Sequence, residues 1–253
     1  MTQMTFQPMS VRKELLNDAL GIRRSLRQDR QEAQSIHALQ SHASFYLIDA
    51  IRCFLVGLFD DGRALATKAR DWLELAIEQG EIPRHYFHGG TESRRHEELA
   101  QCNWLLESRK DRHNVLEAVR WRDVYLNERS DWDDTEIQLT LPLYLEAQAY
   151  ERVIEIFEQK AIKPPKSLKH IRGEGTMSYV LARARQTHDH SAPELQDALD
   201  RFLRRQVRYW LGYGHYTNAA RWMKIAFWQT GTDAVSTLLR CYDYLPEFER
   251  PAV

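Results

Sequence analysis

The chain lacks the features of membrane proteins and of disulfide-bonded secreted proteins. No window holds anything near 18 uncharged apolar residues, and the first ten residues show no basic head followed by an apolar run. Its three cysteines, Cys53, Cys102 and Cys241, are odd in number, far apart and set among apolar or aromatic neighbours. This usage is typical of buried thiols in a reducing compartment rather than of disulfides or a zinc site. We therefore expect a cytoplasmic protein with no membrane partner.

An excess of charge of either sign is also missing. The chain has 35 basic and 36 acidic residues and a formal net charge of −1, so no overall field attracts a polyanion and nucleic acid is not the expected partner. The basic residues are 27 arginines and 8 lysines. Arginine pairs with carboxylates and stacks on aromatic rings, although a GC-rich genome would produce the same bias.

Glycine and proline are sparse, with 11 and 8 among 253 residues. Abundant Ala, Leu, Arg, Glu and Gln favour helices over strands. The composition therefore predicts an all-α fold, and the repeated hairpin pattern described below predicts stacked antiparallel helical hairpins, as either a degenerate solenoid or a compact bundle. We expect a single domain over residues 1–253, with a possible sub-boundary at 161–172 around the Lys163-Pro164-Pro165-Lys166 break.

Periodic apolar residues place the expected helices along the chain. The predicted ranges are about 11–34, 44–59, 65–76, 92–108, 111–127, 133–147, 150–159, 173–186, 193–211, 216–228 and 232–244. Asp60-Asp61-Gly62 is predicted to be the turn that ends the second of them. Residues 80–90 form the longest interruption in the first half and are unusually aromatic, which indicates a surface loop.

No catalytic signature occurs in the sequence. There is no Gly-x-Ser-x-Gly elbow, no cysteine beside a suitably placed histidine and no Walker sequence, and Gly173-Glu174-Gly175-Thr176 is too short for a phosphate loop. We therefore expect no cofactor and no catalytic residue.

Histidines leave one enzymatic alternative open. His85, His88 and His96-Glu97 form one neighbourhood, and His188-Asp189-His190 forms another. Such residues hold metal ions in helical metal-dependent hydrolases, but HExxH and cysteine ligands are missing. The better explanations are loop or binding contacts for the first group and a linker for the second.

Three short stretches share one helical-hairpin pattern. They are Gly57-Leu58-Phe59, Gln148-Ala149-Tyr150 and Gly214-His215-Tyr216, each with an aromatic residue after a tight turn and apolar residues at helical spacing beyond it. The last copy, from Tyr209 to Ala226, resembles a tetratricopeptide repeat because Trp210, Gly214, Tyr216, Ala219 and Ala226 occupy its aromatic and small positions. The aromatic residues are 91 and then 66 residues apart, so the spacing is irregular.

The overall character is also similar to that of all-helical bacterial immunity proteins, which neutralise toxins delivered between competing cells. The resemblance rests on size, richness in Arg and Trp, a repeat-like helical frame and the lack of chemistry. It implies a protein partner, a cognate toxin, but carries over no functional residue.

Candidate partner-binding residues come from the aromatic loop, from an acidic run and from an arginine stripe at helical spacing. Tyr and Trp anchor interfaces, and an arginine stripe can grip an acidic partner, although a solvated face is the simpler explanation for the stripe and a helix cap for the acidic run. The candidates are Arg84, His85, Tyr86, Phe87, His88, Asp131, Trp132, Asp133, Asp134, Arg201, Arg204, Arg205 and Arg208.

The leading hypothesis is a non-enzymatic protein-binding module, in its sharper form an immunity protein. A tetratricopeptide-like adaptor that reads a peptide in a concave groove is the first alternative. The metal-dependent hydrolase is the second.

Overall fold

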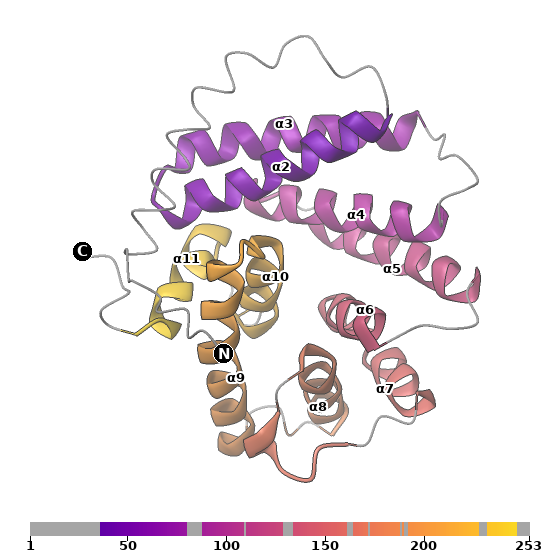
Figure 1. Ribbon diagram of the computed structural model, residues 1–253, viewed down its shortest axis with the longest axis vertical. Coiled ribbons are helices and arrows are strands. Elements are labelled where there is room, and N and C mark those ends of the chain that lie inside the picture. Colours follow the sequence, from indigo (N-terminus) through magenta and orange to yellow (C-terminus); the bar gives the residue numbers. More distant parts are fainter. Residues whose placement is uncertain are drawn as a thin grey trace, which may run out of the picture.

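The described part of the computed structural model consists of helices, several of which are joined by tight turns (Figure 1). The structure describes residues 36–79, 88–108, 110–128, 134–160, 164–171, 173–187, 189, 192–227 and 232–246. Within these ranges no strand occurs, so the predicted all-α fold is confirmed.

The α-helices differ in length from 6 to 20 residues. In chain order they are α2 (Ile36–Leu55), α3 (Phe59–Glu78), α4 (His88–Leu105), α5 (Asp111–Glu128), α6 (Asp134–Glu146), α7 (Tyr150–Gln159), α8 (Glu174–Gln186), α9 (Pro193–Gly212), α10 (Tyr216–Phe227) and α11 (Ala234–Leu239). Two 3-10 helices, η1 (Leu168–His170) and η3 (Arg240–Tyr244), complete the described elements.

Four of the turns between consecutive helices have the same backbone geometry. In each, the second residue after the helix has a positive φ, and the next N–H donates to a carbonyl five residues back. The residues are Gly57 (φ 80°), Glu107 (φ 55°), Gln148 (φ 63°) and Gly214 (φ 76°), and the four hydrogen bonds measure 2.8 to 2.9 Å. This is the Schellman arrangement, which satisfies carbonyls that the helix end leaves open.

The three predicted hairpin turns are therefore present, and the sequence missed a fourth. Glutamate at position 107 gave no signal because a left-handed residue is normally glycine or asparagine. The four positions are separated by 50, 41 and 66 residues. The turns are alike, but their spacing follows no single period.

The predicted turn at Asp60-Asp61-Gly62 is wrong. These residues form the first turn of α3, and the chain reverses earlier, at Gly57. Carboxylates are favourable there because a helix N-terminus carries partial positive charge. A Cβ on Gly62 would lie 2.9 Å from Cδ2 of Phe54, so this glycine allows α2 and α3 to approach closely.

Two helices also begin earlier than predicted. Helix α2 begins at Ile36 rather than near Ser44, and its buried stripe already includes Ala43. Helix α4 begins at His88, inside the segment predicted as a loop. Gly89 and Gly90 indicated a loop, but each glycine costs a helix only about 1 kcal/mol, which does not prevent helix formation.

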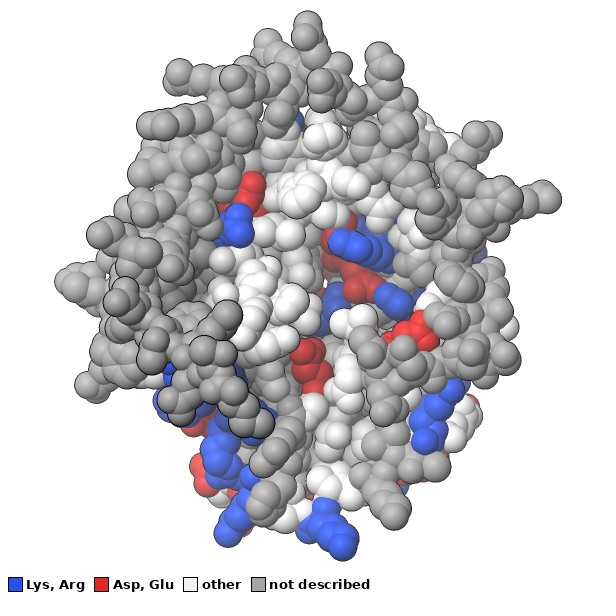
Figure 2. Space-filling model, in the orientation of Figure 1, with Lys and Arg blue, Asp and Glu red and all other residues white. Residues whose placement is uncertain are grey.

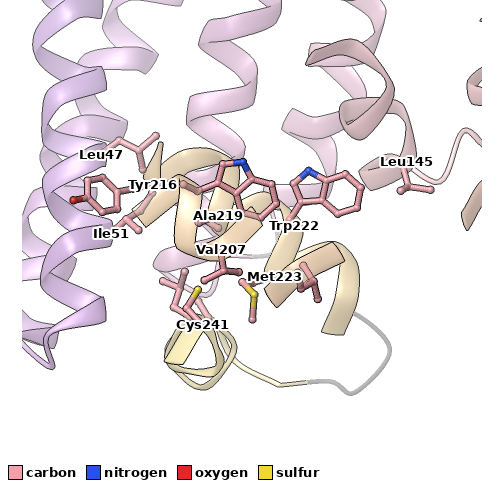
Figure 3. Packing of buried hydrophobic residues seen from close by; sticks show 14 of the residues in the cluster. Leu47, Ile51, Leu145, Val207, Tyr216, Ala219, Trp222, Met223 and Cys241 are labelled. Atoms are coloured by element: carbon pink, nitrogen blue, oxygen red, sulfur yellow. The ribbon is translucent and has the colours of Figure 1, made fainter. Parts of the chain in front are cut away.

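Helix α10 contacts helices from most of the molecule. It packs on its hairpin partner α9 and on α11, and also on α2, α4 and α6. Figure 1 shows α2 to α5 at one end, α7 to α9 at the other, and α10 with α6 in between. In Figure 3, Leu47 and Ile51 of α2 lie beside Tyr216, with Trp222 and Met223 further along α10.

A continuous hydrophobic core includes residues from both sides of the possible boundary at 161–172. Across it, the rings of Phe157 in α7 and Tyr179 in α8 stack with their centroids 4.2 Å apart. None of the described helices is both long and apolar enough to cross a bilayer.

Candidate functional site

Many of the predicted partner-binding residues lie outside the described part of the chain. These are Arg84, His85, Tyr86, Phe87, Asp131, Trp132 and Asp133. His88 and Asp134 are the first residues of α4 and α6, where the structure describes the backbone but not the side chains. For all nine residues, partner binding stays a prediction.

The structure brings the four predicted arginines of α9 together on its solvent-facing side. The opposite side of α9 is buried through an apolar stripe that includes Phe202, Val207 and Trp210. Arg201, Arg204, Arg205 and Arg208 are all exposed. The sequence pattern therefore identified the face correctly, because an amphipathic helix buries one side and solvates the other.

Two of these arginines also hold the helix in place. Arg204 lies 2.8 Å from a carboxylate oxygen of Asp200 and has its guanidinium 5.8 Å from the ring centroid of Tyr244. Arg205 donates to the carbonyl of Ile171 at 2.6 Å. Part of the exposed stripe therefore makes contacts within the protein. Arg201, at its start, makes the fewest contacts with the described residues.

Exposed aromatic residues continue the arginine row. Arg201, Arg205, Tyr209 and Tyr213 follow one another at intervals of four, which places them along one side of the helix and its end. Tyr209 is 49% and Tyr213 68% exposed. The Tyr209 ring lies 4.8 Å from that of Tyr213 and 5.6 Å from that of His215.

We name this region the α9 surface. It consists of Arg201, Arg204, Arg205, Arg208, Tyr209, Tyr213 and His215. The sequence pattern does not mark its aromatic half as a binding surface, because Tyr209, Tyr213 and His215 belong to the repeat-like segment as well as to the continuation of the stripe. The spacing of four from Arg201 onward was the signal available.

Six charged side chains form a chain of ion pairs in the interior, which we name the ionic chain. They are, in order, Asp111, Lys224, Glu146, Arg221, Glu97 and Arg122, and they come from α4, α5, α6 and α10. The five successive N–O distances lie between 2.7 and 3.1 Å. Acidic and basic side chains gather in the same way in a hollow near the middle of the face in Figure 2.

The ionic chain has a central link in Arg221, which is 9% exposed. Its Nη2 lies 2.8 Å from Glu97 of α4 and its Nε 3.0 Å from Glu146 of α6. One guanidinium of α10 therefore joins two other helices. Removing one member of such a buried set leaves an uncompensated charge. The ionic chain therefore holds α10 in its position.

Burial and ion pairing shift the pKa values of these groups in opposite directions. Burial alone would raise the pKa of Glu97, but the guanidinium groups of Arg221 and Arg122 outweigh it and hold that pKa at about 2. For Lys224, burial lowers the pKa and the carboxylates of Glu146 and Asp111 raise it above its ordinary value. Both side chains are therefore charged at neutral pH.

Little in the sequence indicates the ionic chain. In the sequence, Glu97 stands beside His96 in a candidate metal site, and Arg221 lies 124 residues further along the chain. A usable signal was present in α10, where Arg221 and Lys224 lie three residues apart within an apolar run. Such spacing places two cations on one side of a helix that is otherwise buried.

The structure gives His96-Glu97 a setting other than a metal site. Both carboxylate oxygens of Glu97 accept from arginines, at 2.7 and 2.8 Å. Burial lowers the pKa of His96, which favours a neutral imidazole. Among the described residues, no three His, Cys, Asp or Glu side chains are arranged to hold a metal ion. His85, His188 and His190 lie outside them, and Asp189 is exposed.

The glycine-rich segment at the start of α8 also has a structural setting. The Gly175 N–H donates to the side chain of Gln138 from α6 at 2.6 Å. The carboxylate of Glu174 accepts from the indole N–H groups of Trp210 at 3.1 Å and Trp222 at 2.8 Å. This carboxylate therefore joins α8 to both helices of the α9–α10 hairpin.

The three cysteines are buried free thiols, as the sequence predicted. Burial raises the pKa of Cys102 above its ordinary value and that of Cys241 to about 12. A protonated thiol is a poor nucleophile, so these two residues are not activated for covalent catalysis.

The chain matches no protein-family model, and neither curated proteins nor solved structures show a significant similarity to it. What the described site offers is a helix that presents arginine and tyrosine to solvent and is held from inside by its buried apolar side and by the hydrogen bond from the Trp210 indole to Glu174. Those residue types anchor protein interfaces.

Proposed function

We propose that the chain is a non-enzymatic cytoplasmic protein-binding protein and, more specifically, an immunity protein that binds and neutralises a cognate bacterial toxin. The observation that carries the proposal is the α9 surface. It combines four arginines and Tyr209, on one side of a helix whose other side is buried in the core, with Tyr213 and His215 just after the end of that helix.

The composition of the α9 surface favours a protein partner with acidic groups. Tyrosine and arginine are enriched among residues whose truncation weakens binding most. Arginine pairs with carboxylates through two parallel hydrogen bonds. Because the whole chain is nearly neutral, the attraction is local to this surface, which suits a folded acidic patch better than a long polyanion.

The rigidity of the α9 surface supports tight binding. Trp210 of α9 and Trp222 of α10 are fully buried, and both donate to Glu174. A surface that is already ordered loses less conformational freedom when a partner binds. Inhibition of a toxin benefits from such preorganisation because a neutralising complex must persist.

The position of α10 is a reason to prefer this proposal over a peptide-reading adaptor. An adaptor of the tetratricopeptide kind binds its peptide along the first helices of successive hairpins. Here α10 packs on α2, α4 and α6, the first helices of three hairpins, and its Arg221 forms ion pairs with α4 and α6. Helix α10 therefore covers the side of these helices along which an adaptor would bind its peptide.

Co-expression tests the proposal. The toxin is sought among genes adjacent to the gene of this chain and expressed in a sensitive host with and without the chain. We expect growth to be restored by the wild type, and a catalytically inactive toxin to copurify with it at a fixed stoichiometry. Growth arrest that the chain does not relieve, for every adjacent toxin gene, contradicts the proposal.

A further inference from the structure

A cavity of about 460 Å³ lies where six helices meet, and no residue of the α9 surface lines it. Its walls come from the beginning of α5, the end of α6 with the following turn, the first residue of α7, the second half of α8, the beginning of α9 and the end of α10. Its size falls within the range of sites that hold small ligands or a few side chains of a partner.

The walls of the cavity are apolar in depth and polar at the edge. Each of three wall helices places a buried apolar residue one turn away from a polar one, which is exposed or half-buried. The pairs are Val115 with Arg112 on α5, Leu181 with Arg185 on α8, and Leu199 with Gln196 on α9. This arrangement suits a ligand with an apolar body and a polar group beside it.

The charged groups of the lining leave an excess of positive charge. Three basic side chains, Arg112, Arg185 and Lys224, face two acidic ones, Asp111 and Glu146. Both carboxylates are already paired with Lys224, at 3.1 and 2.9 Å. The guanidinium of Arg112 is exposed and forms no ion pair or hydrogen bond with the described residues.

We propose that this cavity takes an apolar side chain of the partner protein while an adjacent carboxylate of that partner pairs with Arg112. The proposal rests on the proposed function, since it assigns a second contact region to the same partner. Charge complementarity selects the occupant: an acidic residue next to an apolar anchor satisfies both the apolar walls and the unpaired guanidinium.

Two dyes test the cavity without a partner. 8-Anilinonaphthalene-1-sulfonate (ANS) is an apolar anion, and N-phenyl-1-naphthylamine has the same rings without the sulfonate. We expect the wild type to bind one ANS molecule, and Arg112→Glu to weaken that binding about tenfold while neutral-dye binding changes less than about twofold. Arg120→Glu is the matched control, since Arg120 is an exposed arginine of the same helix outside the cavity.

Filling the cavity separates it from other dye sites. Ala226→Phe from α10 is expected to abolish binding of both dyes, with Ala147→Phe from the other wall as the second variant should the first not fold. Thermal unfolding near that of the wild type shows that a variant is folded. The inference is overturned if ANS does not bind saturably, or binds the folded cavity-filled variant as well as the wild type.

Displacement by the partner identifies the occupant. The toxin is expected to displace ANS from the wild type, and Arg112→Glu to weaken toxin binding about tenfold. A toxin that binds while ANS stays in place overturns the inference and leaves a small amphipathic anion as the ligand. If no toxin is neutralised, the proposed function fails in the growth assay, independently of the dye results.

Discussion

The two helices of the α9–α10 hairpin use arginine in opposite ways. In α10, Arg221 is buried and bonded to Glu97 and Glu146. In α9, Arg201 and Arg208 face solvent. The same residue type therefore stabilises the position of one helix and remains accessible on the other. Part of the arginine richness of this chain is therefore structural, and the exposed part is the one to which the proposed function assigns partner binding.

The difference follows from the neighbours of each helix. Helix α10 lies between α2, α4, α6, α9 and α11, so any charge on it must find a partner in the interior. One side of α9 is exposed and packs against none of the described α-helices, and arginine stays hydrated there at little cost. Substitutions in the two helices should therefore have effects of very different size.

The largest effect is expected for Arg221→Ala. Removing this guanidinium leaves the buried carboxylates of Glu97 and Glu146 without one of their cations, which costs about 3 to 5 kcal/mol of unfolding free energy. Urea denaturation measures the change. The double variant Glu97→Gln with Arg221→Met is the control and should lose less than the sum of its single changes, whereas strict additivity would contradict the coupling.

Lowering the pH should selectively remove the contribution of Glu97 to the free energy of unfolding. Because its pKa in the folded protein is about 2, against 4.5 for an ordinary glutamate, the stabilisation is fully present above about pH 4.5 and is lost as the pH falls towards 2. The advantage of the wild type over Glu97→Gln in unfolding free energy should shrink between pH 5 and pH 2. A constant difference across this range would contradict the ion pairs.

A smaller effect is expected at the turn that joins the two helices. Gly214 has φ 76°, and a Cβ there would meet Tyr216 at an ordinary distance of 3.8 Å. Gly214→Ala should therefore cost only the backbone strain, about 1 to 2 kcal/mol. Glu107→Gly in the corresponding turn should be neutral or stabilising. Thermal unfolding compares the two, and a loss of stability in Glu107→Gly would contradict the shared turn geometry.

The smallest effect on stability is expected on the α9 surface. Arg201→Ala should change the unfolding free energy by less than about 0.5 kcal/mol, because the side chain is exposed and makes no contact that fixes the helix. Urea denaturation beside Arg221→Ala measures the contrast directly. A loss above 1 kcal/mol would show that this arginine is structural.

The turns and helices were the most predictable features because they depend on local chemistry. Gly57, Gln148 and Gly214 each precede a helix in which apolar residues recur, and all three have the left-handed backbone that ends the preceding helix. The errors were local too. Asp60-Asp61-Gly62 carries turn-forming residues, yet acidic residues also favour the first turn of a helix.

The ionic chain and the cavity could not be predicted from local patterns. Glu97 and Arg221 meet because α10 returns to pack on α4, and no periodicity encodes that contact. The cavity likewise needs six helices to converge. By contrast, the arginine stripe of α9 was predictable, since spacing along one helix fixes which residues share a side.

The most direct test of the central claim compares the affinity of the neutralised toxin for two variants whose substituted residues are about equally exposed in the wild type. Tyr213 on the α9 surface is 68% exposed and Phe45 on α2 is 65% exposed. Calorimetric titration should show that Tyr213→Ala weakens binding at least about tenfold, while Phe45→Ala stays within about twofold of the wild type. Equal affinities for the wild type and Tyr213→Ala, with both proteins folded, would contradict recognition through the α9 surface.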